Sequence, residues 1–362
     1  MLQITNQIRE EIKTIPTEEY APDSKPSNLK ADLSLNINPF GVSPKVIDRI
    51  KNLSAKTISQ YYPENKTLIK IIADYVKVKP ENILMGDGCD GCLEMIAKTF
   101  IAKNDSVIIP IPTFHRYEFH TKLMGGIPEF VNMQDFNLSG DEIINRTSKK
   151  PTKLVFLCNP NNPTGKEIKK EDKVKILENF KGIVVVDEAL ADITTVNGSE
   201  LIKRYKNLII VRSFSKSFGL ASLRIGYIVA DPQVISQIRK VSSPFKVNGM
   251  AQELAIEALK DKEHIERSVE FLNQQRKYLI QELTGIGLEC TDSKTTNILV
   301  NVEKINPDAK QVVSRLKEQG VLVTDASYFR VPKNKYVRIA VSSEKENRLF
   351  IQTIKDILNS TK

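Results

Sequence analysis

Short runs of branched apolar residues, each ending in polar or turn-forming residues, most constrain the fold of this chain. Five such runs occur between residues 106 and 231, and a segment of helical periodicity, "KEDKVKILENF", lies among them. Strands that are buried on both faces have near-continuous apolar sequences and alternate with crossover helices, so the pattern predicts βαβ units and a mainly parallel sheet. The five runs are "SVIIPIP", "TKLVFLCNP", "GIVVVDEA", "NLIIVRSFS" and "RIGYIVAD".

The regions on either side of this central part have a different character. Residues 1–32 are polar and punctuated by prolines, which predicts a short helix followed by an extended arm. Residues 56–250 contain the apolar runs and are expected to form a large α/β domain. Helical periodicity after residue 250, followed by mixed strand and helix patterns, predicts an interdomain helix and a small α+β domain over 251–362.

The charge of the chain does not by itself identify a partner. A formal net charge of +9 is compatible with binding to nucleic acid or to an anionic membrane surface. The lysines, however, are scattered among glutamates, as in "KKEDKVK" and "KDKEHIER", and form no long basic run. This distribution favours an ordinary surface or an anionic small-molecule ligand over nucleic acid.

The cysteines and the apolar segments bear on metal binding and location. Only Cys89 and Cys92 form a CxxC pair, and no second pair or neighbouring histidine completes a zinc site, so no metal is expected. No signal peptide is recognisable, and no apolar run approaches the roughly 18 residues of a membrane span. We therefore expect a cytoplasmic protein with reduced thiols and no membrane contact.

Polar residues at the ends of the apolar runs are the candidate site residues, because ligands bind at the carboxyl ends of parallel strands. Asp187 in "VVVDEA" follows a predicted strand, where a carboxylate needs a cationic or N–H partner, although alone it could be a capping residue. "NPNNPTG" (159–165) is a proline-fixed turn rich in side-chain amides. "GDGCDG" (86–91) precedes a helical segment, and glycine turns of this kind can cradle a phosphate.

The stretch "RSFSKSFGLASLRIGY" adds a lysine, Lys216, and an arginine, Arg224. Alone, it could be a loop entering a helix with a solvated lysine. Together, the four features require a phosphorylated, cationic, planar cofactor and an amine that can be linked to it. Pyridoxal phosphate meets these requirements: its phosphate needs N–H groups, hydroxyls and an arginine, its pyridinium nitrogen a carboxylate, and its aldehyde a lysine.

The series "NPNNPTG", "DEA", "SFSKSFGLASLRIGY" and "YVRIAV" resembles the fold-type-I pyridoxal-phosphate enzymes of the class I/II aminotransferase group. Within this group the chain is most similar to the histidinol-phosphate aminotransferase branch and the related threonine-phosphate decarboxylase branch, from "LNINPFGVSP" to "VRIAVSS". The resemblance implies an aspartate-aminotransferase-like α/β fold. A large domain with a mainly parallel seven-stranded sheet flanked by helices would be joined to a smaller α+β domain, to which residues 33–55 would contribute on the substrate side.

The resemblance also implies a role for each residue of the cofactor site. Lys216 would be the Schiff-base lysine and proton carrier, and Asp187 would keep the pyridine nitrogen protonated. Asn162 would hydrogen-bond the phenolic oxygen, while Phe114 and Ala189 would pack on the two faces of the ring. The phosphate would be held by N–H groups, hydroxyls and a guanidinium of Cys89, Asp90, Ser213, Ser215 and Arg224.

Further residues are implied on the substrate side and at a subunit interface. Arg338 of "YVRIAV" matches the arginine that binds the substrate α-carboxylate, or the equivalent group, in a bidentate fork. Asn36 lies in the segment lining the substrate side, and Tyr20 lies in the arm that covers it. Tyr62 of "YYPE" matches a tyrosine that reaches the phosphate from the neighbouring subunit, which implies a homodimer. The implied reaction moves an amino group between an amino acid, or an amino-alcohol phosphate, and a 2-oxo acid.

Two positions depart from the family pattern and leave the reaction and the substrate open. Leu190 of "DEAL" stands where aminotransferases of the group usually have a tyrosine, and the decarboxylase branch tends to have an apolar residue there. Thr324 of "GVLVT" stands where both branches usually have an arginine that helps bind the substrate's phosphate. An aminotransferase is the first expectation. The alternatives are an α-decarboxylase or another specialised biosynthetic pyridoxal-phosphate enzyme, and a non-catalytic domain that has kept the fold.

Overall fold

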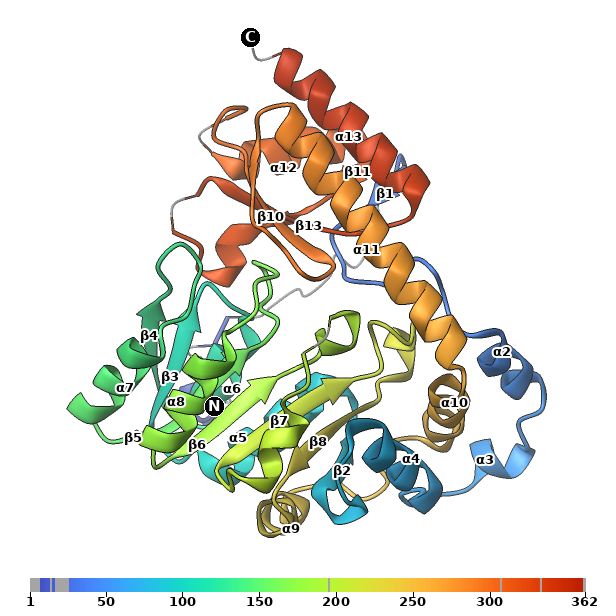
Figure 1. Ribbon diagram of the computed structural model, residues 1–362, viewed down its shortest axis with the longest axis vertical. Coiled ribbons are helices and arrows are strands. Elements are labelled where there is room, and N and C mark those ends of the chain that lie inside the picture. Colours follow the sequence, from blue (N-terminus) through green and yellow to red (C-terminus); the bar gives the residue numbers. More distant parts are fainter. Residues whose placement is uncertain are drawn as a thin grey trace, which may run out of the picture.

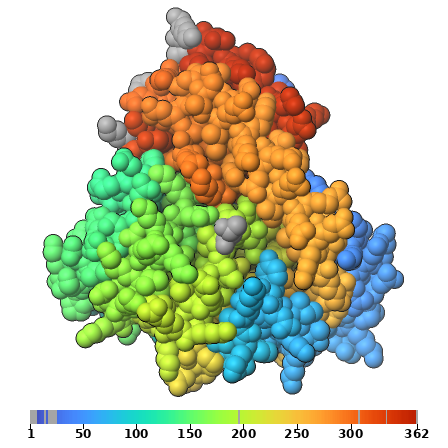
Figure 2. All heavy atoms as spheres, in the orientation of Figure 1, coloured from blue at the N-terminus to red at the C-terminus, as the bar shows by residue number. Residues whose placement is uncertain are grey.

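The computed structural model describes residues 7–13, 15–16, 26–194, 196–306, 308–332 and 334–360. Tyr20, which the sequence assigns to the covering arm, lies outside these residues. Figure 1 shows a large sheet with helices in the lower part of the view and a smaller C-terminal body above it. Figure 2 shows the orange side chains of the C-terminal body packed directly on the green part of the chain.

The large sheet has seven strands in the order β2-β8-β7-β6-β5-β3-β4. Neighbouring strands are parallel except at β8, which is antiparallel to both β2 and β7. The mainly parallel seven-stranded sheet is therefore confirmed. The strands are β2 (Ile83–Gly86), β3 (Ser106–Ile111), β4 (Ile127–Asn132), β5 (Thr152–Cys158), β6 (Ile183–Asp187), β7 (Leu208–Ser213) and β8 (Gly226–Ala230).

Helices cover both faces of this sheet, and alternate side chains of β5 show why. Leu154 and Phe156 pack into a core with side chains of α5 and α9, whereas Val155 and Leu157 pack into a second core with side chains of α4 and α8. A strand with two buried faces needs apolar residues at consecutive positions, as the sequence provides. The helices of this part are α4 (Lys66–Val76), α5 (Gly88–Phe100), α6 (Arg116–Leu123), α7 (Gly140–Lys149), α8 (Lys170–Asn179) and α9 (Pro232–Lys240).

The C-terminal body has its own sheet and its own core. Its antiparallel sheet has the order β12-β13-β10-β9, and a separate parallel pair joins β1 to β11. The segment that contains β1, although it comes from the N-terminal part of the chain, is thus part of the C-terminal body. The strands are β1 (Ala31–Asp32), β9 (Glu289–Cys290), β10 (Asn297–Asn301), β11 (Val321–Leu322), β12 (Thr324–Asp325) and β13 (Tyr336–Ala340).

Long helices connect and cover the two parts. α11 runs between them and contacts α13 in the C-terminal body (Figure 1), while α10 packs on α2, α3 and α4 of the large part. The domain boundaries at residues 32, 55 and 250 stay a prediction. The remaining helices are α1 (Glu10–Lys13), α2 (Pro44–Lys51), α3 (Ala55–Ser59), α10 (Gly249–Lys260), α11 (Lys262–Gly285), α12 (Ala309–Glu318) and α13 (Glu344–Asn359).

The described residues include neither a candidate membrane-spanning helix nor a candidate metal site. No helix in the described ranges has the length and apolar character needed to cross a membrane. The same part of the chain contains no group of three or more His, Cys, Asp or Glu side chains arranged to hold a metal ion.

Strand β8 passes unusually close to the turn that begins α5. A Cβ atom on Gly226 would lie 2.7 Å from the Arg212 carbonyl oxygen, 2.8 Å from the Gly88 carbonyl carbon and 3.0 Å from the Cys89 nitrogen. All three are backbone atoms, so no side-chain rotation can make room for it. The glycine at this position therefore sets the distance between β8 and the turn.

We predict that Gly226→Ala lowers the free energy of unfolding by about 1–3 kcal/mol, because the added methyl forces backbone atoms apart. Urea denaturation with the unfolding midpoint as readout measures the change. Gly285→Ala is the matched control: it lies at the end of α11 with no atom within 4 Å of the added Cβ, and stability should be unchanged or slightly higher. Equal midpoints for Gly226→Ala and the wild type would contradict the prediction.

Candidate active site

A cavity of about 960 Å³ lies where the carboxyl ends of the parallel strands face the C-terminal body. Its lining comes from both bodies, with β6 and β7 contributing residues from one side and β13 from the other. Twelve of the residues expected at the site from the sequence line this single cavity: Asn36, Cys89, Asp90, Phe114, Asn162, Asp187, Ala189, Ser213, Ser215, Lys216, Arg224 and Arg338.

Tyr62 does not line the cavity of its own chain. Its hydroxyl donates a short hydrogen bond to Glu253 Oε1 on α10, and its ring lies against Gly249, where a Cβ would be 2.6 Å from it. This placement is compatible with the expectation that Tyr62 serves a neighbouring subunit, which the single chain does not test.

Lys216 follows β7 and extends into the cavity. Its Nζ donates a hydrogen bond to the carbonyl oxygen of Asn36 at 2.8 Å. Burial, together with the nearby positive charges of Arg338 and Arg224, lowers the pKa of Lys216 to about 8. Because only a neutral amine attacks a carbonyl carbon, this environment prepares Lys216 for covalent chemistry near neutral pH.

Asp187 ends β6, and its carboxylate is held by three donors. Oδ1 accepts from the Ala189 N–H at 2.9 Å and lies 3.4 Å from the Cys89 thiol, while Oδ2 accepts from the Tyr117 hydroxyl at 2.8 Å. Burial raises the pKa of Asp187, and the hydrogen bonds from Ala189 and Tyr117 oppose that rise. A buried carboxylate held in this way can stabilise a positive charge placed beside it.

Tyr117 is a site residue that the sequence reasoning missed. It is fully buried on α6, and its ring stacks on Phe156 at 5.0 Å with an interplanar angle of 11°. Its edge also meets the Phe114 ring at 5.7 Å. In the sequence this residue is the tyrosine of "PTFHRY", three residues after Phe114. It contacts Asp187 because α6 begins at Arg116.

The turn before α5 is shaped to accept an anion. Gly88 has φ +82°, and a Cβ there would lie 2.5 Å from Arg224 Nη2, so only glycine lets this guanidinium approach the helix start. The free N–H groups and the dipole at a helix N-terminus favour negative charge. Ser213 and Ser215, both buried, line the cavity as well, and the Ser215 N–H donates to Ser213 Oγ at 3.1 Å.

The side chain of Asp90 is paired with Arg116 and His120. Its two oxygens accept from Arg116 Nε and Nη2 at 2.8 and 2.9 Å, and His120 Nε2 lies 2.9 Å from Oδ1. Burial alone would raise the pKa of Asp90, but the hydrogen bonds from His120 and Arg116 hold it well below its usual value. Asp90 thus lines the cavity as a charged, structurally paired residue, and only its backbone N–H is suited to bind a phosphate.

Asn162 and Leu190 also line the cavity. Asn162 Oδ1 is buried and finds no hydrogen-bond partner among the described residues, as expected where a ligand completes the site. Leu190 is buried and packs with Leu33 and Ile193 in the core of the C-terminal body. Its side chain therefore supplies an apolar wall and no hydrogen-bond donor.

Arg338 on β13 is held at the opposite side of the cavity. Its Nη2 donates to Thr324 Oγ1 at 2.5 Å and makes a short bond to the Ser34 carbonyl, and its Nη1 lies 3.4 Å from Asn297 Oδ1. Thr324 Oγ1 in turn donates to the same Ser34 carbonyl at 2.8 Å. Asn297, which sequence reasoning did not identify, also accepts a short hydrogen bond from Asn36 Nδ2. It connects the segment beside Lys216 to Arg338.

Arg330 does not replace the arginine that is absent at position 324. It makes a bidentate ion pair with Glu118 at 2.7 and 2.8 Å and lies over the Phe130 ring, outside the cavity. Lys317, at the end of α12, is an exposed cation that does line the cavity.

Comparison with known proteins identifies the family. Residues 29–354 match the family model described as aminotransferase class I and II. The chain belongs to this family. Histidinol-phosphate aminotransferase of Thermoanaerobacter pseudethanolicus is 37% identical over 359 residues, covering 98% of this chain and 99% of the relative.

Solved structures agree with this assignment. Histidinol-phosphate aminotransferase from Sinorhizobium meliloti in complex with pyridoxal-5'-phosphate has a TM-score of 0.88 at 23% identity and covers 98% of each chain. L-threonine-O-3-phosphate decarboxylase from Porphyromonas gingivalis has a TM-score of 0.79 at 26% identity, covering 91% of this chain and 100% of that chain.

The chain is a pyridoxal-phosphate-dependent aminotransferase, with amino acids and 2-oxo acids as its substrate classes. The residues present fit this cofactor, on grounds independent of the comparisons. The glycine turn admits Arg224 to a helix start, Asp187 is a buried carboxylate, and Lys216 has a lowered pKa. Asn162 has a buried oxygen with no hydrogen-bond partner in the part of the chain that the structure describes.

We predict that an amine-selective reagent labels Lys216 in the cofactor-free protein with a midpoint near pH 8. The sign follows from the lowered pKa: the amine is neutral, and reactive, above about pH 8, whereas an ordinary lysine reaches that state only near pH 10.4. Peptide mass mapping after brief labelling over a range of pH measures the midpoint. Exposed Lys51, in the same samples, is the internal control, and a Lys216 midpoint equal to an ordinary lysine's would contradict the prediction.

Proposed function

We propose that this aminotransferase acts on histidinol phosphate, or on a closely related amino-alcohol phosphate, and returns the amino group to a 2-oxo acid. The name carried by the relatives at 33–37% identity, over 88–99% of this chain, is the observation that carries the proposal. Cations in the cavity wall support an anionic substrate. Arg338 is buried on one side of the cavity, and Lys317 is exposed at its edge.

The roles of the cofactor-binding residues are part of this proposal. Lys216 would form the covalent link, Asp187 would hold a proton on the pyridine nitrogen, and Asn162 would hydrogen-bond the phenolic oxygen. Phe114 and Ala189 would enclose the ring between them. Pyridoxal phosphate, when bound, supplies an electron sink for the charge left on the substrate's carbon when a bond there breaks.

Phosphate binding would use the positive end of α5. The N–H groups of Cys89 and Asp90, the hydroxyls of Ser213 and Ser215 and the guanidinium of Arg224 all line the same cavity. Four of these five contributors sit at the ends of secondary-structure elements, whose positions the sheet fixes. The cluster would therefore anchor the cofactor without rearrangement of the chain.

The chain's own residues would then manage the proton transfer. Lys216 Nζ, released from its covalent link when substrate binds, would take the proton from the substrate's α-carbon and deliver it to the cofactor's C4′ carbon, two bonds away. Its pKa of about 8 suits both steps, since the amine can exist in either form near neutral pH. The hydrogen bond from Nζ to the Asn36 carbonyl oxygen would hold the amine in place between the two transfers.

Arg338 would bind the anionic group of each substrate in turn. Histidinol phosphate has no carboxyl group, so the arginine would meet its phosphate in one half-reaction and a 2-oxo acid's carboxylate in the other. Anchoring by Thr324, Asn297 and the Ser34 carbonyl would keep the guanidinium in one place for both substrates.

A decarboxylase is the second candidate, and two observations favour it. Leu190 places no donor at the phenolic oxygen, as in the branch that the chain resembles at this position. A solved structure named L-threonine-O-3-phosphate decarboxylase shares the fold at 26% identity.

We predict that histidinol phosphate converts the bound cofactor to pyridoxamine phosphate in a single half-reaction, and that a 2-oxo acid reverses the conversion. Absorbance spectra and chromatography of the released cofactor follow both steps. Borohydride reduction before substrate is added should fix the cofactor on Lys216, and Lys216→Ala is the control. Release of carbon dioxide from threonine phosphate without pyridoxamine phosphate would favour the decarboxylase, and a cofactor fixed on another residue would overturn the role of Lys216.

We further propose a cytoplasmic homodimer whose subunits share the active site. An apolar surface supports the dimer: Ile58, Tyr61 and Phe245 are 72%, 84% and 51% exposed, and the last two stack at 4.9 Å. Contiguous exposed apolar patches mark protein–protein interaction sites. All four cysteines are free thiols, which supports a reducing compartment.

We predict that Tyr62→Phe and Lys216→Ala, each poorly active alone, regain activity when they are mixed and allowed to exchange subunits. In the mixed dimer one site would combine an intact Lys216 with an intact Tyr62 from the other chain. Sedimentation measures the dimer, and the initial rate of the mixture measures complementation. A monomeric active enzyme, or a mixture no more active than Tyr62→Phe alone, would contradict the shared site.

A further inference from the structure

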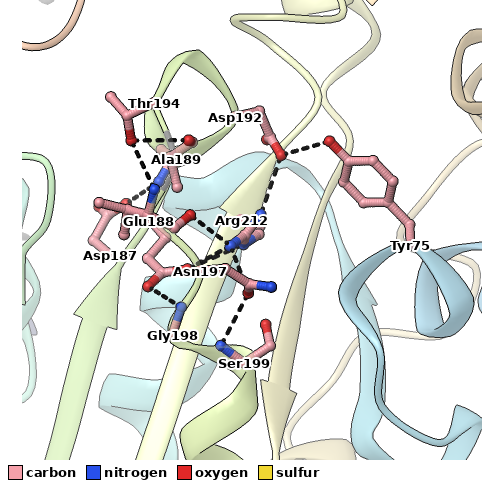
Figure 3. Close-up of polar contacts among 12 residues, drawn as sticks. Tyr75, Asp187, Glu188, Ala189, Asp192, Thr194, Asn197, Gly198, Ser199 and Arg212 are labelled. Atoms are coloured by element: carbon pink, nitrogen blue, oxygen red, sulfur yellow. Dashed lines mark hydrogen bonds and ion pairs between the residues drawn. The ribbon is translucent and has the colours of Figure 1, made fainter. Parts of the chain in front are cut away.

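Three charged side chains are buried together directly behind the ends of β6 and β7. Glu188, Asp192 and Arg212, which we call the Arg212 cluster, have side chains that are 0%, 3% and 4% exposed (Figure 3). None of the three lines the cavity. The cluster is therefore not part of the cavity surface. Two of its members nevertheless adjoin cavity residues in the sequence: Glu188 follows Asp187, and Arg212 precedes Ser213.

Arg212 is the centre of the cluster. Its Nη2 and Nε donate to Glu188 Oε2 at 2.7 and 3.1 Å, and its Nη1 donates to Asp192 Oδ1 at 3.1 Å. The partners are fixed in turn: Glu188 Oε1 accepts from the Gly198 N–H at 2.9 Å, and Asp192 Oδ1 accepts from the Tyr75 hydroxyl at 2.8 Å (Figure 3). One guanidinium thus joins the β6 turn to β7, and Tyr75 extends the connection to α4.

Stability alone gives a weak reason for this arrangement. Removing charges from water costs much of what their attraction returns, and well-packed apolar groups of similar volume often stabilise a protein as well or better. Two carboxylates face a single guanidinium here, and Asp192 Oδ2 has no hydrogen-bond partner among the described residues. What the cluster does supply is a fixed geometry between segments that are distant in the sequence.

The alternation of side chains along a strand connects this geometry to the site. Asp187 points into the cavity and the next residue, Glu188, points into the cluster. On the neighbouring strand Arg212 points into the cluster and the next residue, Ser213, lines the cavity. A shift of the Glu188–Arg212 contact must therefore move Asp187 relative to Ser213 and Lys216. Gly198 shows how close the packing is, because a Cβ there would lie 2.5 Å from Glu188 Oε1.

We propose that Glu188 and Arg212 are positioning residues for the transamination reaction, which hold Asp187 and Ala189 in register with Ser213 and Lys216. Asp192 anchors the far end of the same turn, beyond Leu190. The inference rests on the proposed roles of Asp187 and Lys216, and it adds residues that touch neither substrate nor cofactor.

Glu188→Gln tests the proposal, because it keeps the shape of the side chain and removes its charge. We expect kcat to fall and the dissociation constant of the cofactor to rise, each by about 10- to 100-fold, since small misplacements of reacting groups cost that much. KM for the amino donor should change by less than about threefold, because Arg338 belongs to the other sheet. Arg212→Lys keeps the charge but loses the fork, so it should show the same pattern to a lesser degree.

Ile354→Val is the control for a purely structural role. It removes one methylene from the fully buried core of the C-terminal body, so it lowers Tm without touching either strand end. The proposal is overturned if Glu188→Gln lowers Tm as the control does and leaves kcat and cofactor binding within about twofold of the wild type.

A readout without cofactor separates this inference from the proposed function. In the cofactor-free Glu188→Gln protein, loosening the end of β7 should admit water to Lys216 and raise the midpoint of its amine labelling from near pH 8 toward that of an ordinary lysine. If the wild type fails to fix cofactor on Lys216, the proposed function fails. If the wild type succeeds and the variant keeps both its labelling midpoint and its kcat, only the positioning role fails.

Discussion

The hydrogen-bonded pairing of β6 with β7 is the constraint on which the site depends. Asp187 pairs with Val211, and the Glu188 N–H donates to the Val211 carbonyl at 2.8 Å, so the two strands end side by side. The Asp187 carboxylate and the Lys216 amine therefore reach the same cavity from the ends of adjacent strands of one sheet. The hydrophobic packing that buries both faces of β6 and β7 holds these strand ends in place.

Burial and specific hydrogen-bond partners together set the pKa values of the ionisable groups at the site. Burial raises the pKa of Asp187 and lowers that of Lys216, so it opposes the charged form of each. Hydrogen bonds from the Tyr117 hydroxyl and the Ala189 N–H stabilise the charged carboxylate, whereas the Lys216 amine donates to an uncharged acceptor, the Asn36 carbonyl oxygen. Asp187 therefore remains suited to carry a negative charge, whereas Lys216 is suited to lose its positive charge, although both line the same cavity.

The sequence predicted the elements with strong local patterns and missed those without them. The segment "KEDKVKILENF", expected to be helical, forms α8, and the five apolar runs form β3, β5, β6, β7 and β8. Strand β2 was missed because it has four residues, and β4 because it is a half-exposed edge strand containing Pro128. Local motifs likewise identified Lys216 and Asp187, which line one cavity. Contacts between distant segments, such as that of Asn297 with Arg338, leave no pattern that one sequence can show.

The two departures from the family pattern have different structural consequences. Leu190 packs into an apolar core, so the site lacks the hydrogen-bond donor that a tyrosine would supply at this position. No described residue nearby replaces that donor. Thr324 takes an active part: its hydroxyl accepts from Arg338 and donates to the Ser34 carbonyl, so both bonds need a short side chain at that position. A longer arginine there would meet the guanidinium of Arg338 as a like charge. Thr324 therefore fixes the position of Arg338 and adds no second cation beside it.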